Sequence, residues 1–230
     1  MQFCKDHEYT YQFKESEFYG LPFEVNDFIS KEGVKDYMMS ICRYSPREYQ
    51  IEGVYDALRH NRKLLISPTA SGKSLMIYSI VRYYVERKQS TLIVVPTTSL
   101  VEQMYKDFAD YGWDVGSYCH KIYAGKERET DSQVIITTWQ SIYKLPRKYF
   151  ERFSVVVGDE AHQFKSKSLV SIMSKLADAK YRYGFTGTLS GSQTHKWVLE
   201  GLFGPSYKII KTDELMKKGH VATLDINVLL

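Results

Sequence analysis

After about residue 60, the chain alternates short apolar runs with stretches of helical periodicity. The apolar runs carry little polar alternation, which is typical of strands buried on both faces of a sheet. The pattern predicts strands at residues 64–67, 91–95, 133–137, 154–157, 182–186 and 222–230. It predicts helices at residues 73–87, 98–111, 168–177, 196–202 and 213–218, and a short helix from Trp139. Buried strands separated by helices form parallel sheets, so we expect an α/β fold with helices on both faces of the sheet.

Residues 1–43 lack this regular pattern. They predict a hairpin of residues 9–13 with residues 17–21, followed by a helix near residues 25–40. We interpret them as a small α+β amino-terminal segment, a candidate remnant of a DNA-binding domain. Its aromatic residues lie beside lysines, which suits either stacking on bases or a small half-buried core.

The second region, residues 44–230, opens with a helix-start signal. Ser45-Pro46-Arg47-Glu48 matches a capping box, with Ser45 as the N-cap, Pro46 as the first helical residue and Glu48 as the third. The helix that it begins is expected to end near residue 60.

The composition excludes several classes of protein. The cysteines, Cys4, Cys42 and Cys119, are odd in number and far apart, so neither a disulfide framework nor a zinc site is expected. The chain contains no apolar run of bilayer length and no signal peptide, so we expect a cytoplasmic protein without a membrane partner. The formal net charge of +4 allows nucleic-acid binding without demonstrating it.

A candidate phosphate loop follows the first predicted strand and opens a predicted helix. Its backbone N–H groups and the helix N-terminus would form an anion site for ATP. Lys73 would reach the β- and γ-phosphates, the Ser74 hydroxyl would hold Mg²⁺, and Gly72 would let the backbone approach the phosphates. The predicted ATP-binding residues of this loop are Thr69, Ala70, Ser71, Gly72, Lys73 and Ser74. Because Ser67 replaces the first glycine of the full pattern, an ordinary strand-to-helix turn is the alternative.

Two acids end the apolar strand at residues 154–157. Adjacent carboxylates at a strand end are costly unless a cation or water uses them. Asp159 is expected to bind Mg²⁺, and Glu160 to orient and deprotonate the attacking water, so the predicted catalytic residues are these two acids and Lys73. The alternative for the acid pair is a helix cap. His162 suits either a coupling role or a structural one.

The phosphate loop and Asp-Glu-Ala-His together resemble those of superfamily 2 helicases. Further segments of the chain resemble family motifs in the same order. Arg47-Glu48-Tyr49-Gln50 resembles the motif in which a glutamine reads adenine, which implies ATP-binding roles for Gln50 and Arg47. Phe185-Thr186-Gly187-Thr188 resembles motif III, which implies that Thr186 and Thr188 couple the nucleotide state to DNA.

Two other segments resemble DNA-gripping motifs. Residues 95–100 look like motif Ia and residues 137–141 like motif Ib. Both follow predicted strands, where hydroxyl groups and helix N-termini can hold a nucleic-acid backbone. The candidate DNA-binding residues are Thr97, Thr98, Thr138, Trp139 and Gln140. Trp139 suits core packing as well as base stacking.

The resemblance implies a fold and an activity. Residues 44–230 would be the first RecA-like, ATP-binding domain of a helicase that uses ATP and Mg²⁺. A second RecA-like domain in cis, expected to be absent from this chain, would supply arginines to the ATP site. Without it, this chain alone is expected to hydrolyse ATP poorly, because such arginines contribute about 10³–10⁵ in rate in related systems.

The segments Pro-Thr-Ala-Ser-Gly-Lys-Ser, Val-Pro-Thr-Thr-Ser-Leu, Thr-Trp-Gln-Ser and Gly-Leu-Phe-Gly are similar to those of phage recombination and repair helicases. This narrower resemblance implies action on branched DNA or single-strand–duplex junctions, recombination proteins as partners, and the host cytoplasm as location. The alternatives are the motor portion of a restriction endonuclease, a nucleotide-dependent nucleic-acid clamp without turnover, and a small-molecule kinase.

Overall fold

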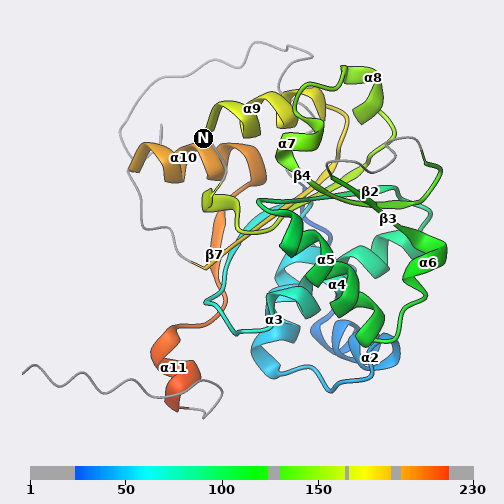
Figure 1. The fold of residues 1–230 in the computed structure, drawn as a ribbon. Helices are drawn as coiled ribbons and strands as arrows, with labels where there is room; N and C mark the ends of the chain where they lie inside the picture. The colour runs from blue at the N-terminus through cyan, green and yellow to red at the C-terminus, as the bar shows by residue number, and fades with distance from the viewer. Residues whose placement is uncertain (1–23, 124–129, 164–165, 188–192, 218–230) are drawn as a thin grey trace, which may run out of the picture.

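The computed structural model describes residues 24–123, 130–163, 166–187 and 193–217, and in this part of the chain seven strands form one parallel sheet between two layers of helices (Figure 1). The strands lie in the spatial order β3 (Cys119–Ile122), β4 (Val134–Thr138), β2 (Thr91–Val95), β5 (Val155–Gly158), β6 (Tyr181–Thr186), β1 (Arg62–Ile66) and β7 (Ser206–Lys208). Each neighbouring pair of strands is parallel. The α/β fold expected from the pattern is therefore confirmed.

Helices cover both faces of the sheet, so the central strands carry apolar side chains on both faces. Every residue of β2, β4 and β5 is buried. In β5, Val155 and Val157 belong to one hydrophobic cluster, and Val156 belongs to the cluster on the other face. Successive side chains of a strand point to opposite faces of the sheet, so valine side chains occupy both faces of β5.

The helices divide into two layers. One layer comprises α2 (Lys31–Ile41), α3 (Glu48–Arg59), α4 (Lys73–Glu86), α5 (Thr98–Asp110) and α6 (Val115–Tyr118). The other comprises α7 (Trp139–Ile142), α8 (Arg147–Phe150), α9 (Ser166–Lys175) and α10 (Gln193–Phe203). The short η2 (Ala161–Gln163) follows β5, and α11 (Thr212–Lys217) follows β7. Within the described ranges, no helix combines the length and the apolar character needed to cross a bilayer.

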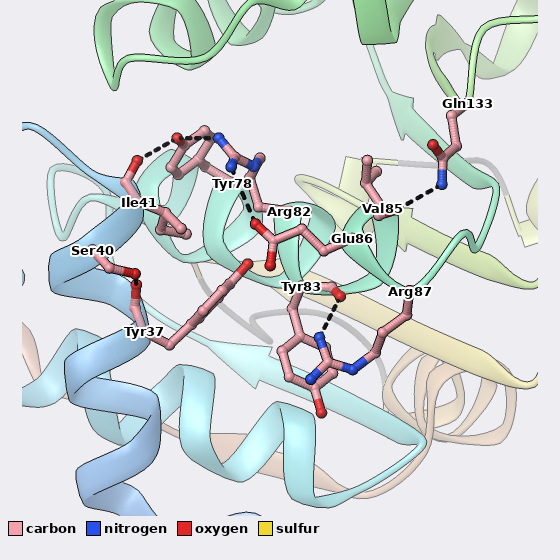
Figure 2. A network of polar contacts seen from close by, with 10 residues as sticks. All are labelled: Tyr37, Ser40, Ile41, Tyr78, Arg82, Tyr83, Val85, Glu86, Arg87 and Gln133. Carbon is pink, nitrogen blue, oxygen red and sulfur yellow. Dashed lines mark hydrogen bonds and ion pairs between the residues drawn. The ribbon is translucent and has the colours of Figure 1, made fainter.

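Helix α2 packs on α3, and its side chains reach α4 in a shared core. Val34 and Met38 of α2 belong to the hydrophobic cluster that α4 and the sheet form. The Tyr78 hydroxyl of α4 donates a hydrogen bond of 2.7 Å to the carbonyl oxygen of Ile41, and Arg82 donates to that same hydroxyl at 3.2 Å (Figure 2). The end of α2 is therefore tied to the middle of α4.

Helix α2 begins later than the predicted residues 25–40. Ser30 is its N-cap and accepts a hydrogen bond of 3.1 Å from the backbone of Gly33. The preceding residues turn back toward the start of β1, where Val25 forms an antiparallel bridge with His60. Because the backbone of Glu24 also donates to the side chain of Asn61, this segment uses its polar groups outside a helix.

Helix α3 begins at Glu48, so the predicted start at Ser45 is wrong. Its N-cap is Arg47, whose backbone N–H donates to the side-chain oxygen of Gln50 at 2.9 Å. Gln50 is thus the third residue of the helix and caps it. The later start places this amide where it also reaches the phosphate loop.

Five short elements were not predicted, namely α6, β3, α8, η2 and β7. The strands β3 and β7 are the two edges of the described sheet, and both carry polar residues such as Lys121 and Ser206. Edge strands are short and half solvated, so they lack the continuous apolar run of the central strands. The predicted hairpin within residues 9–21 and the predicted strand at 222–230 lie outside the described residues.

Gly184 of β6 provides a test of this packing. A Cβ atom at this position would lie 2.8 Å from Leu64 Cδ1 and 2.8 Å from Phe203 Cγ. Since overpacking a core costs about 1–3 kcal/mol, Gly184→Ala should lower the free energy of unfolding by that amount, measured by urea denaturation.

Gly201 of α10 is the matched control, because a Cβ atom there has no neighbour within 4 Å. Gly201→Ala should raise the free energy of unfolding by about 0.5–1 kcal/mol, through helix propensity. Equal effects of the two substitutions would contradict the packing described for β6 and α10.

Candidate functional site

The loop between β1 and α4 has the backbone of a phosphate-binding turn. Ala70 and Gly72 adopt left-handed conformations, with φ of 64° and 77°. Gly72 is the N-cap of α4, and a Cβ atom there would lie 2.3 Å from Nε2 of Gln50. The backbone angle therefore favours glycine, and a Cβ atom at this position would displace the side-chain amide of Gln50.

The serine that replaces the first glycine of the phosphate-loop pattern has an internal role. The hydroxyl groups of Ser67 and Ser71 lie 2.6 Å apart, and the Ser71 hydroxyl also donates to the carbonyl oxygen of Pro68 at 2.6 Å. Both serines are fully buried. Ser67 thus braces the loop from inside, which explains how the loop keeps its shape without that glycine.

The start of α3 holds the loop from outside. The carbonyl oxygen of Ser71 accepts hydrogen bonds from the Gln50 side chain at 3.0 Å and from the Tyr49 hydroxyl at 2.9 Å. Arg47 donates to that Tyr49 hydroxyl at 3.0 Å. Gln50, which was predicted to read adenine, therefore contacts the phosphate loop directly. Arg47 reaches the loop only through Tyr49, a residue that sequence reasoning missed.

The two acids at the end of β5 lie next to the phosphate loop. Glu160 Oε1 forms an ion pair of 3.0 Å with Lys73 Nζ, and these side chains are 18% and 10% exposed. Glu160 adopts a left-handed backbone with φ of 49°, and its N–H donates to Asp159 Oδ1 at 2.9 Å. The structure therefore brings the three predicted catalytic residues together.

Asp159 is in an unfavourable electrostatic environment. Its side chain is 7% exposed. Burial and, to a smaller extent, the neighbouring charge of Glu160 raise the pKa of its carboxyl group to about 6, while Lys73 and the hydrogen bond from the Glu160 backbone oppose the rise. A nearby cation would stabilise the charged form, which suits a metal-binding carboxylate.

Mg²⁺ fits the donor groups available at this edge. Mg²⁺ is usually held by one or two carboxylates together with substrate phosphates and water, without an all-protein cage. The described residues contain no cluster of three or more histidine, cysteine or acidic side chains. The carboxylate of Asp159 and the hydroxyl oxygen of Ser74 would be such a small set of metal ligands.

The predicted coupling histidine contacts the predicted motif III. His162 Nδ1 lies 2.8 Å from the hydroxyl oxygen of Thr186 and 3.4 Å from Glu160 Oε2. The next residue, Gly187, lies beside the phosphate loop, because a Cβ atom there would be 3.7 Å from the Thr69 hydroxyl. Thr188 lies outside the described residues.

Ser74, predicted to bind Mg²⁺, contacts a residue that the sequence did not indicate. Its hydroxyl lies 2.7 Å from the hydroxyl of Tyr111, the residue that follows α5. No periodicity or motif distinguishes this tyrosine from the many others in the chain, so no sequence signal could have selected it.

The candidate DNA-binding residues follow β2 or lie at and after the end of β4, and these two strands are neighbours in the sheet. Thr97 and Thr98 are exposed, and Thr97 caps α5 by accepting from the backbone of Leu100 at 3.3 Å. Gln140 is exposed and donates to the carbonyl oxygen of Pro96 at 3.3 Å, which ties the two segments together.

The other two candidates are less accessible. Thr138 is buried, and its hydroxyl lies 2.9 Å from that of Ser141. Trp139 is half-buried and packs edge-to-face on Tyr143. These contacts favour a structural role for both side chains, so Thr97, Thr98 and Gln140 are the better placed to meet a ligand.

The Asp159 environment predicts a pH dependence of stability. A carboxyl group whose pKa is raised by folding stabilises the folded state fully below its unfolded pKa, and this contribution is lost as pH rises through the folded pKa. Between the ordinary value of 3.8 and a value of about 6, the loss reaches at most about 3 kcal/mol. In chelator, Asp159→Asn should therefore be as stable as wild type near pH 4 and more stable at pH 8.

Urea denaturation across this pH range measures the difference, and Asp131→Asn, at an exposed position, is the control. A difference between wild type and Asp159→Asn that stays constant with pH would contradict the described environment.

Comparison with known proteins identifies the family. The family model described as "Type III restriction enzyme, res subunit" matches residues 43–191. The chain is 35% identical over 190 residues to the ATP-dependent DNA helicase uvsW of Enterobacteria phage T4, which covers 80% of this chain and 38% of that protein. It is 30% identical over 173 residues to the DNA 3'-5' translocase XPB2 of Sulfurisphaera tokodaii, covering 75% of this chain and 37% of that protein.

A solved structure agrees with these sequence relationships. The crystal structure of the UvsW helicase from bacteriophage T4 superposes with a TM-score of 0.76 at 30% identity, over 90% of this chain and 75% of that one. The chain thus spans well under half the length of the two relatives compared by sequence. On the family match, the sequence identity to the phage helicase and the shared fold, the chain belongs to the superfamily 2 helicase family described as the res subunit of type III restriction enzymes.

Proposed function

We propose that this chain is the ATP-hydrolysing domain of a DNA helicase or translocase that unwinds, rewinds or branch-migrates branched DNA. The observation that carries the proposal is the ion pair of 3.0 Å between Lys73 of the phosphate loop and Glu160 of β5's end. It brings a phosphate-binding cation and a candidate base into one buried site. A nucleic-acid clamp without turnover would not need that base.

The ion pair also suggests how the site responds to ATP. Bound phosphates compete for Lys73, and moving its ammonium group toward them frees Glu160 to accept a proton from water. Mg²⁺ supplies positive charge that stabilises the transferring phosphoryl group. Asp159 and Ser74 would hold that ion, while the Ser67–Ser71 brace keeps the loop in its phosphate-binding shape.

Motif III offers a route from the nucleotide to DNA. Strand β6 lies between β5 and β1 in the sheet, so its end lies between the acids and the phosphate loop. Thr186 contacts His162 on one side, and Gly187 lies near Thr69 on the other. A change at either nucleotide-binding element would therefore act on Thr186 and Gly187 at the end of β6.

The two relatives compared by sequence support DNA as the partner of this chain. One is a DNA helicase and the other a DNA translocase. The exposed hydroxyl groups of Thr97 and Thr98, at the N-terminus of α5, suit contacts with backbone phosphates. We extend the proposal to branched DNA or single-strand–duplex junctions, recombination proteins as partners, and the host cytoplasm as location.

The two relatives compared by sequence are much longer than this chain, and our proposal includes a second RecA-like domain. We propose that it acts in cis and completes the ATP site with arginine residues, as the family resemblance implies. The chain alone would then hydrolyse ATP slowly, since such arginines contribute about 10³–10⁵ in rate.

The motor portion of a restriction endonuclease is the second candidate, because the matching family model is described by such a subunit. The 35% identity to the phage helicase over 190 residues favours the first candidate. Double-strand cleavage of unmodified DNA by the full-length protein would favour the second.

Lys73→Ala tests the ATP site. In the full-length protein, we expect this substitution to lower DNA-stimulated ATP hydrolysis by about 100- to 1,000-fold, because it removes a charge from the transferring phosphoryl group. Phosphate release with and without branched DNA is the measurement. Lys35→Ala, at an exposed position on α2, is the control and should leave the rate unchanged. Wild-type hydrolysis that ignores DNA would oppose the proposed function.

Thr98→Glu tests the DNA-binding surface. An acidic residue in the first turn of α5 does not disturb the helix, because it complements the helix dipole. A carboxylate facing DNA phosphates costs about 1 kcal/mol, so we expect about fivefold weaker DNA binding at low salt and a smaller loss at high salt.

Fluorescence anisotropy with labelled junction DNA measures both affinities. Gln103→Glu adds the same charge to an exposed position further along α5 and should have a smaller effect. If both variants bound DNA as wild type does, this surface would not face DNA.

A further inference from the structure

The Ser74 hydroxyl is contacted by side chains that lie outside the phosphate loop. Tyr111, at the end of α5, places its hydroxyl 2.7 Å from that of Ser74. One turn earlier on the same helix, burial raises the pKa of Asp107, and a hydrogen bond from Ser74 opposes that rise. Helix α5 therefore presents two oxygen-bearing side chains to one serine hydroxyl.

The chemistry of a hydroxyl group gives this contact a consequence. A serine hydroxyl has one proton and two lone pairs. It can ligate a cation only through a lone pair, so its proton must point to an acceptor elsewhere. In the described part of the chain, the polar groups that contact the Ser74 hydroxyl are those of Tyr111 and Asp107. Asp159, the other candidate magnesium ligand, instead accepts a hydrogen bond at Oδ1 from the backbone of Glu160.

Tyr111 is itself held firmly. Its carbonyl oxygen accepts a hydrogen bond of 3.2 Å from the backbone of Arg43. Its ring lies 5.2 Å from the ring of Tyr78 and packs edge-on against Tyr44. Tyr78 is in turn anchored to Ile41 at the end of α2 (Figure 2). The position of the Tyr111 hydroxyl is therefore set by packing between α2, α4 and α5.

We propose that Tyr111, supported by Asp107, is a positioning residue for Ser74 that fixes its side-chain rotamer and engages its proton, leaving an oxygen lone pair for Mg²⁺. This inference rests on the proposed function, because it assumes that Mg²⁺ and nucleotide occupy the site. Tyr111 contacts neither of them in this scheme. Its effect reaches the metal only through the Ser74 oxygen.

Tyr111→Phe tests the proposal by nucleotide binding, without relying on turnover. The affinity of the full-length protein for a fluorescent ADP analogue is measured with Mg²⁺ and with chelator. We expect the variant to lose about fivefold in affinity with Mg²⁺, the size of one hydrogen bond, and to bind as wild type does in chelator. In a Ser74→Ala background, Tyr111→Phe should have no further effect.

Tyr105→Phe, which removes a hydroxyl from the same helix away from Ser74, is the matched control and should bind as wild type does under both conditions. Equal losses with Mg²⁺ and in chelator would show a purely structural role and overturn the proposal. Tighter Mg²⁺-dependent binding by Tyr111→Phe would overturn it too, because the contact would then restrain Ser74 from the metal. Wild-type binding that ignores Mg²⁺ would instead overturn the proposed function, together with this inference.

Discussion

Parallel pairing of the strands is the constraint on which the rest of the structure depends. In a parallel sheet all carboxyl ends meet at one edge, so every segment that follows a strand emerges there. The order β2, β5, β6, β1 then determines which segments are neighbours. The phosphate loop follows β1, the acids follow β5, and motif III follows the strand between them. The contacts of Lys73 with Glu160 and of His162 with Thr186 are consequences of this order.

The site edge is polar, and its backbone groups are satisfied by side chains from several elements. The carbonyl oxygen of Ser71 accepts from Tyr49 and Gln50, and the hydroxyl of Ser71 pairs with Ser67. Such groups would be costly to bury without partners. The loop is thus braced from inside by serines and from outside by the first turn of α3. Because the loop is already ordered, it loses less conformational entropy when phosphates bind.

Helix α5 connects two candidate sites of the chain, the DNA surface and the nucleotide site. Its N-terminus carries the exposed Thr97 and Thr98, and its C-terminal end reaches Ser74 through Tyr111. A single rigid helix thereby touches both the candidate DNA surface and the candidate magnesium ligand. The link between α2 and α4 through Tyr78 supports the Tyr111 end of that helix.

The sequence by itself determined the central strands and the helices that follow them, and it placed the candidate phosphate loop and acid pair at the ends of two of those strands. These features are local, because a buried strand must be apolar and a phosphate turn needs Gly72 in a left-handed conformation. The edge strands and the start of α3 were not predicted correctly, since solvent and tertiary contacts decide them. Only the tertiary structure decided that Tyr49 holds Ser71 and that Tyr111 holds Ser74. Those pairs join residues 22 and 37 positions apart, and no local pattern records which tyrosine lies across from which serine.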